Sequence, residues 1–252
     1  MKLAFSKPTA TLDEQQQLFA HFRGVGYDGL QLKNSQYRDY FDRPERFAEE
    51  WQQVPGAGAA LIIGGKLDDA GQTTLRKLFR FAEVVGTERI VFCHAQARKG
   101  LSNDDIKGFA RTLSELGKEA QQRGTNLSLH HHYDQPVMHR PDFDVFFDAV
   151  DEQTVGLTVD TAHLVKSGIH NVAGVIRDFH QVIDNFHLKD YADGEWHVLG
   201  QGALDFAPIF AAIQAIAYDG WLSADEESGS ELVGAMQACH DYILAGLALK
   251  TP

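Results

Sequence analysis

Short apolar stretches and longer amphipathic stretches alternate along this chain. The apolar and β-rich runs predict strands at residues 2–6, 27–32, 59–63, 89–93, 126–129, 155–159, 182–186 and 221–224. Between them, apolar residues at helical spacing predict helices at residues 12–22, 44–51, 75–85, 104–123, 142–150, 172–179, 206–217 and 231–249. Strands that alternate with helices pair in parallel, because each return to the sheet needs a crossover. Eight such units without a linker predict one α/β domain over residues 1–252, a (β/α)8 TIM barrel.

An open, doubly wound parallel sheet is the competing architecture. Such a sheet normally carries a glycine-rich phosphate loop after its first strand. Here the first predicted strand leads into the segment KPTA at residues 7–10 instead. We therefore expect the closed barrel.

The charge balance and the cysteine content narrow the class of protein. The 252 residues include 23 Lys and Arg against 35 Asp and Glu, a formal net charge of -12. Nucleic-acid binding needs clustered cations that displace counterions, so we expect no nucleic-acid partner. Two cysteines are too few for a disulfide framework and fit a reducing compartment. The opening apolar run is too short for a signal peptide and no run approaches the ~18 apolar residues of a spanning helix, so we expect a cytoplasmic protein without a membrane partner.

Histidines and carboxylates follow the ends of the last five predicted strands. The carboxyl ends of all strands in such a barrel meet at one rim, where the active site lies. The residues are, in order, His94, His130, His131, His132, Asp160, His163, His187, Asp225 and Glu227, and Lys189 lies with them after the seventh strand. Imidazole nitrogens mixed with carboxylate oxygens form a ligand set for Mn, Fe, Co or Zn rather than Ca. In an extended segment His130 and His132 point one way and His131 the other, so at most two of the three face the site.

Four segments resemble those of a known barrel superfamily. They are VDTAH at 159–163, FHLKD at 186–190, LGQGALD at 199–205 and YDGWL at 218–222. On these segments the chain resembles the xylose isomerase-like barrel superfamily, in the sugar phosphate isomerase/epimerase group. The resemblance spans nearly the whole length, and it implies one divalent metal ion, with Mn, Co, Fe or Zn preferred over Mg.

The resemblance also implies a ligand set. Members of this kind hold the metal with Glu, Asp, His and Glu from the fifth to eighth strands. Asp160 and His187 match the second and third of these positions, and Asp225 falls at the fourth, with Glu227 on the same face as an alternative. The fifth strand carries His130 where the family has Glu, which puts a strict two-glutamate mechanism in doubt.

We expect the remaining residues at the rim to bind a sugar substrate or to transfer its protons. His163 matches a family histidine that contacts substrate oxygens, and Glu227 or His132 is expected to transfer protons. The residues expected to line the substrate pocket with His163 are His94, Lys189 and His197. For these three the alternatives stay open: a core histidine, a structural salt bridge and a surface histidine, respectively.

The leading functional hypothesis is an isomerase or epimerase of a small, unphosphorylated keto or aldo sugar, acting through a metal-stabilised enediolate. The second is a dehydratase of a keto-cyclitol or keto-sugar, because strand-five ends resembling HHH at 130–132 also occur in inosose dehydratases. A non-catalytic sugar-binding barrel is the alternative from another class. DNA-repair members of the superfamily need extra histidines on early strands, which this chain lacks. Because barrels of this group often pair, we also expect a homodimer.

Overall fold

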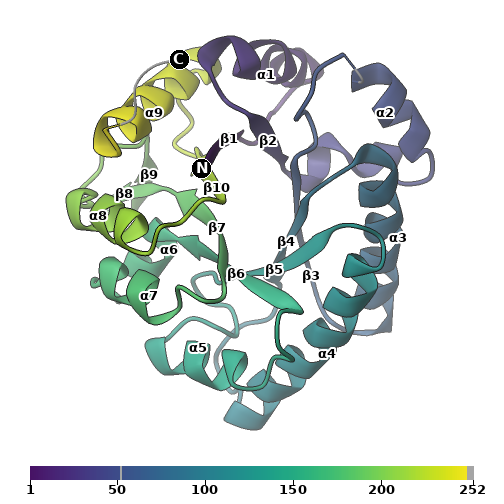
Figure 1. Cartoon of the computed structure of the whole chain (residues 1–252), viewed down its shortest axis with the longest axis vertical. Helices are drawn as coiled ribbons and strands as arrows, with labels where there is room; N and C mark the ends of the chain where they lie inside the picture. The colour runs from purple at the N-terminus through teal and green to yellow at the C-terminus, as the bar shows by residue number, and fades with distance from the viewer. Residues whose placement is uncertain (52, 249–252) are drawn as a thin grey trace.

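Eight parallel strands close into a barrel in the computed structural model, which describes residues 1–51 and 53–248 (Figure 1). The strands are β1 (Lys2–Ser6), β2 (Gly29–Leu32), β3 (Ala60–Gly65), β4 (Arg89–His94), β5 (Asn126–His130), β6 (Val155–Asp160), β7 (Ile183–Leu188) and β10 (Trp221–Asp225). Their order around the barrel is β1-β10-β7-β6-β5-β4-β3-β2, so the last strand pairs with the first. The predicted (β/α)8 barrel is confirmed.

A helix follows each strand and packs outside the barrel, as Figure 1 shows. These helices are α1 (Leu12–Val25), α2 (Pro44–Trp51), α3 (Asp69–Val85), α4 (Asn103–Gln121), α5 (Arg140–Phe147), α7 (Val172–Asp178), α8 (Ala207–Ala215) and α9 (Leu232–Gly246). The third starts at Asp69 rather than at residue 75, because the Asp68 side chain accepts a hydrogen bond from the Gly71 N–H and caps it. The predicted end of the last helix, residue 249, lies outside the described residues.

Several short elements were not predicted, and they lie beyond the carboxyl ends of strands. They are η1 (Asn34–Gln36), η2 (Arg38–Tyr40), α6 (Thr161–Lys166) and the hairpin of β8 (Asp190–Ala192) and β9 (Glu195–His197). The two turn residues of the hairpin, Asp193 and Gly194, both have positive φ, 51° and 91°. This is the pattern that an Asp-Gly pair favours in a two-residue turn, so the sequence did carry a signal for the hairpin.

Side chains alternate along each barrel strand between the interior and the helix layer. The interior below the rim is polar: Gln31 Nε2 donates to Asn185 Oδ1 over 2.8 Å, and the hydroxyls of Ser128 and Thr158 lie 2.7 Å apart. The layer between strands and helices is apolar and buried, and it supplies the hydrophobic core. Within the described part of the chain, no helix combines the length and hydrophobicity of a membrane crossing.

Candidate active site

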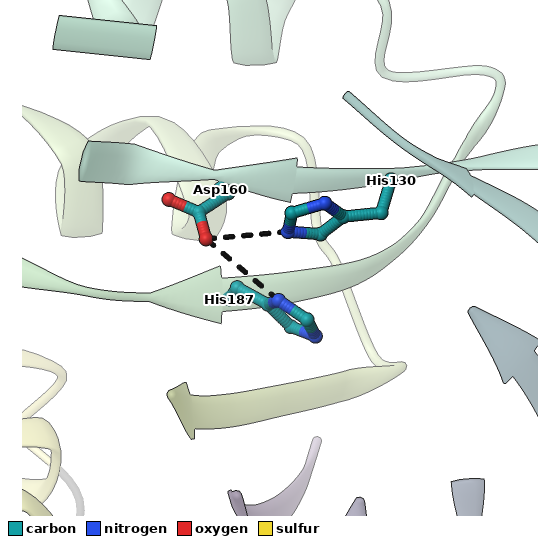
Figure 2. Close-up of side chains that lie close together, drawn as sticks. All are labelled: His130, Asp160 and His187. Atoms are coloured by element: carbon teal, nitrogen blue, oxygen red, sulfur yellow. Dashed lines mark hydrogen bonds and ion pairs between the residues drawn. The ribbon is translucent and has the colours of Figure 1, made fainter. Parts of the chain in front are cut away.

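Three side chains from neighbouring strands converge inside the rim of the barrel (Figure 2). Asp160 Oδ2 lies 3.3 Å from His130 Nε2 and 3.7 Å from His187 Nδ1. One potential ligand atom from each residue lies within 4.8 Å of the others, and all three residues are buried. We call His130, Asp160 and His187 the metal cluster, because two imidazoles and a carboxylate are a suitable donor set for a transition-metal ion.

The orientation of His187 fits metal binding. Its Nε2 lies 3.0 Å from Gln31 Oε1, an acceptor, so this nitrogen carries the proton. Its Nδ1 therefore presents a lone pair, and this buried atom has no hydrogen-bond partner. A ligating histidine typically donates its other N–H to an oxygen acceptor in this way, which sets the tautomer.

His130 and Asp160 are also held in the protonation states that metal binding requires: a neutral imidazole and an ionised carboxylate. Burial lowers the pKa of His130 to about 4, which keeps the imidazole neutral. Its second nitrogen, Nδ1, contacts Cys93 Sγ at 3.4 Å. Burial works to raise the pKa of Asp160, but His163, His130, His187 and Lys189 outweigh it and hold the pKa well below the usual range. Asp160 therefore stays ionised.

Asp160 is fixed by two further contacts. Its Oδ1 accepts a hydrogen bond from the His163 N–H over 2.8 Å and so caps α6, which begins at the next residue. Its own backbone N–H donates to His131 Nε2 over 2.9 Å. His131 thus faces away from the cluster and packs on Phe143, as the predicted alternation of the three histidines requires.

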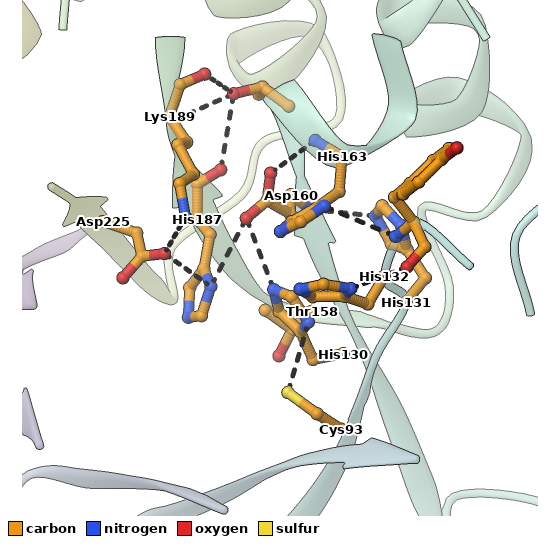
Figure 3. A network of polar contacts seen from close by, with 12 residues as sticks. Cys93, His130, His131, His132, Thr158, Asp160, His163, His187, Lys189 and Asp225 are labelled. Carbon is orange, nitrogen blue, oxygen red and sulfur yellow. Dashed lines mark hydrogen bonds and ion pairs between the residues drawn. The ribbon is translucent and has the colours of Figure 1, made fainter. Parts of the chain in front are cut away.

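Four charged residues form a second group beside the metal cluster, which we call the lysine–carboxylate ring: Lys33, Lys189, Asp225 and Glu227. Lys33 Nζ lies 2.6 Å from Asp225 Oδ1 and 2.7 Å from Glu227 Oε1. Lys189 Nζ lies 3.1 Å from Asp225 Oδ2 and also contacts Glu227 Oε2. Each lysine thus bridges both carboxylates, and Figure 3 shows Lys189 and Asp225 next to His187.

The ring stays charged although it is largely buried. Burial raises the pKa of Asp225, but Lys189 and Lys33 outweigh it and leave the pKa well below the usual range. Burial and Asp225 raise the pKa of Glu227, yet the same two lysines lower it overall. Burial lowers the pKa of Lys189, but Asp225, Asp160 and Glu227 reverse this and raise it.

Two histidines, His132 and His163, lie on the other side of Asp160 from Lys189, as Figure 3 shows, and Trp196 lies against both His163 and Lys189. The rings of His132 and His163 lie 3.7 Å apart, and Trp196 of β9 lies 4.9 Å from His163. Trp196 also lies 4.5 Å from Lys189 Nζ. The hairpin therefore places an aromatic ring against Lys189 of the lysine–carboxylate ring and against His163.

Two residues expected in the substrate pocket lie elsewhere. His94 faces the helix layer, where its ring lies 4.4 Å from Phe109 of α4, and neither ring nitrogen has a hydrogen-bond partner. His197 pairs with Asp190 next to Trp196 on the hairpin, and successive strand residues face opposite sides, so its side chain points away from the face that Trp196 presents to the site. The residues that sequence reasoning missed are Lys33, Gln31 and Trp196.

Asp190 organises the loop after the hairpin. Its carboxylate accepts backbone N–H groups of Tyr191, Gly200, Gly202 and Leu204, over 2.8 to 3.2 Å. A Cβ atom on Gly202 would lie 2.3 Å from Asp190 Oδ1, so only glycine fits there. This explains why glycine stands at position 202 in the segment LGQGALD.

A model of the family described as xylose isomerase-like TIM barrel matches residues 20–241. The chain belongs to this family. It is similar to the inosose dehydratase of Clostridium beijerinckii, with 29% identity over 145 residues, which is 50% of this chain and 48% of that protein. It is similar to the inosose dehydratase of Clostridium perfringens, with 28% identity over 156 residues, 54% of this chain and 52% of that one. The matched region thus spans about half the length of these relatives.

Solved structures share the fold over nearly the whole chain. An L-ribulose 3-epimerase has a TM-score of 0.81 at 18% identity and covers 98% of this chain and 94% of its own. The IOLI protein, solved with a zinc atom, has a TM-score of 0.78 at 18% identity and covers 98% of both chains. At this identity the likeness shows the fold alone.

Proposed function

We propose that this member of the xylose isomerase-like family is a metal-dependent dehydratase of a small polyhydroxylated ketone, of the keto-cyclitol class. The single observation that carries the proposal is the position of the buried metal cluster directly beside the lysine–carboxylate ring, with His187 Nδ1 3.8 Å from Asp225 Oδ2. The metal cluster is suited to hold a divalent cation. The lysine–carboxylate ring contains ammonium groups that can donate a proton and carboxylates that can accept one.

His130, Asp160 and His187 would hold the ion, and the unpartnered Nδ1 of His187 supports this assignment. A divalent ion at such a site supplies Lewis-acid polarisation of a carbonyl oxygen, which acidifies the adjacent C–H. Two imidazoles and one carboxylate fit Zn, Fe, Co or Mn better than Mg.

Glu227 and Lys189 provide the proton transfers. Glu227, ionised and about 29% exposed, takes the proton from the carbon next to the carbonyl. The electron pair of that bond forms a carbon–carbon double bond as the β-carbon–oxygen bond breaks, and the Lys189 ammonium protonates the departing hydroxyl to water. Glu227 then holds one extra proton and Lys189 lacks one, and their direct contact returns it, so the ring is restored.

We assign the orientation of the substrate to His132 and His163, and the exclusion of water to Trp196. His163 and His132 lie across Asp160 from Lys189, where their imidazoles can bind substrate hydroxyls. Trp196 covers Lys189 and His163 and keeps both out of bulk water. A water-poor site strengthens the electrostatic interactions that the reaction uses.

Two further points support dehydration. The relatives matched at 28–29% identity are named inosose dehydratases, over about half their length. An epimerase that uses two carboxylates as bases needs one on each side of the substrate carbon, whereas here Asp225 and Glu227 both lie in the ring and the fifth strand carries His130. Isomerisation or epimerisation remains the second candidate, favoured by the His132–His163 pair, which offers a second proton-transfer group on the opposite side.

The test is incubation of the metal-loaded protein with an inosose and, separately, with ketohexoses, followed by mass spectrometry. Loss of one water from the inosose supports the proposal. A product that has the mass of the substrate when formed in H2O, and that is heavier when formed in D2O because it takes up deuterium, replaces it with the epimerase. Tight binding of these compounds without any turnover replaces it with a sugar-binding barrel.

A further inference from the structure

Asp225 stands at the strand-eight position that usually supplies a metal ligand, yet both its oxygens contact lysines. Lys33 Nζ lies 2.6 Å from Oδ1, and Lys189 Nζ lies 3.1 Å from Oδ2. Its Oδ2 lies 3.8 Å from His187 Nδ1, about as close as Asp160 Oδ2 at 3.7 Å, but the group of potential ligand atoms that all lie within 4.8 Å of one another comprises His130, Asp160 and His187 without Asp225. An aspartate side chain is also one methylene shorter than the glutamate that the family resemblance implies there.

Lys33 is held in place by its own surroundings. Its backbone N–H donates to Gln36 Oε1 over 2.8 Å, and Gln36 Nε2 donates to the Lys7 carbonyl oxygen over 2.9 Å. Gln36 is buried with 1% of its surface exposed, so it ties the ends of β1 and β2 together. These contacts fix the backbone of Lys33, and its half-buried ammonium is held by Asp225 and Glu227.

Charge also favours keeping Asp225 in the ring. The ring pairs two ammonium groups with two carboxylates, and each group contacts both partners of opposite sign. Withdrawing Asp225 toward the metal cluster would leave the buried Lys189 and the half-buried Lys33 sharing Glu227 alone. Removing one partner of a buried ion pair is costly, because the other charge is left uncompensated.

We propose that Lys33 and Lys189 hold Asp225 out of the ligand set, so that the metal centre has only three protein ligands, His130, Asp160 and His187. This inference rests on the proposed function and refines it. Catalytic metal centres commonly use three protein ligands and leave a position open for substrate. Lys33 is then a positioning residue that keeps the carboxylates of the ring on the substrate side of the site.

The test is the affinity for Zn²⁺, measured by competition with a chromogenic chelator. We expect Asp160→Asn to weaken Zn²⁺ binding by about 100-fold or more, since it removes a ligand, while Asp225→Asn and Asp225→Ala change it by less than about threefold. Circular dichroism of the metal-free variants establishes that each is folded. If Asp225→Ala loses Zn²⁺ as Asp160→Asn does, the three-ligand centre is wrong.

A second arm tests Lys33. Lys33→Met should leave Zn²⁺ affinity undiminished but lower kcat for an inosose by at least about 10-fold, and Lys33→Arg should restore part of that loss. The matched control is Lys118→Met, which removes a lysine that pairs with Glu115 and Asp151 on the surface and should alter neither quantity. Weaker Zn²⁺ binding in Lys33→Met, or an unchanged kcat, overturns the inference.

Metal binding by the wild-type protein separates a failure of the proposed function from a failure of the three-ligand centre. A wild-type protein that binds no Zn²⁺ or other divalent ion contradicts the proposed function itself. A wild-type protein that binds Zn²⁺ and needs Asp225 to do so contradicts only the three-ligand centre.

Discussion

Thr161 and Lys189 are joined by two hydrogen bonds across the ends of β6 and β7. The Lys189 N–H donates to Thr161 Oγ1 over 2.9 Å, and this hydroxyl donates to the Lys189 carbonyl oxygen over 2.6 Å. Both residues are buried. One hydroxyl therefore sets the backbone position from which the Lys189 side chain reaches the lysine–carboxylate ring.

Replacing Thr161 should affect both stability and turnover. Thr161→Val keeps the shape but leaves two buried backbone groups of Lys189 unpaired, so we expect about 1–3 kcal/mol of destabilisation in urea unfolding. A lower kcat at unchanged metal content should accompany it, because Lys189 loses its fixed position. Thr161→Ser, which keeps the hydroxyl, is the control. A Thr161→Val protein as stable as the wild type would contradict this role.

Metal binding should raise the thermal stability of the protein. A ligand that binds only the folded state at about 100 times its Kd adds about 2.7 kcal/mol, which corresponds to roughly 5–10 °C in Tm for a chain of this size. Differential scanning fluorimetry of chelator-treated protein with and without Zn²⁺ measures this shift. Asp160→Asn, which can still cap α6 through its amide oxygen, should show no shift.

Gln31 should control metal affinity without contacting the metal. It accepts the hydrogen bond from His187 Nε2 and so leaves Nδ1 unprotonated. We expect Gln31→Leu to weaken Zn²⁺ binding by about 10- to 100-fold, the usual cost of losing such a supporting group. Gln31→Glu retains an acceptor and should bind more tightly than Gln31→Leu. Equal affinities for the wild type and the leucine variant would show that the tautomer of His187 is set in another way.

His94 should make the protein sensitive to mild acid. Burial lowers the pKa of His94 to about 4, below its ordinary value of 6.5, so the unfolded chain takes up this proton more readily than the folded one. The stabilisation is fully present above pH 6.5 and is lost as the pH falls toward 4, by about 2 kcal/mol between pH 7 and 5.

The variant that tests this is His94→Phe, which keeps a ring against Phe109 but cannot be protonated. Its Tm should fall less between pH 7 and 5 than that of the wild type. His21→Phe, on the exposed surface of α1, is the matched control. Parallel losses in the wild type and His94→Phe would contradict the assignment.

Trp196 should report on the site by its fluorescence. The chain has 3 tryptophans, and the other two, Trp51 and Trp221, line a hollow of about 540 Å³ at the opposite end of the barrel. We expect an inosose to change the emission of the wild type and of Trp51→Phe but not of Trp196→Phe. A change that persists in Trp196→Phe would place ligand binding away from the hairpin.

The convergence of His130, Asp160 and His187 was predictable from sequence because it follows from topology. Parallel barrel strands all end at one rim, so residues at the ends of successive strands must meet there. His94, the last residue of β4, shows where this reasoning fails. Both faces of a barrel strand are buried, so the apolar run at 89–93 does not reveal which way His94 points, and the structure places it on the helix side.

The sequence by itself therefore determined the order of the elements and the rim at which the chemistry-bearing residues gather, because both depend on local periodicity and on the end of each strand. Only the tertiary structure decided the side-chain partners. Lys33 meets Asp225 from 192 residues away, and Trp196 rather than His197 faces the site because of the pairing of the hairpin. Such contacts depend on side-chain packing between distant segments, which leaves no periodic trace in the sequence.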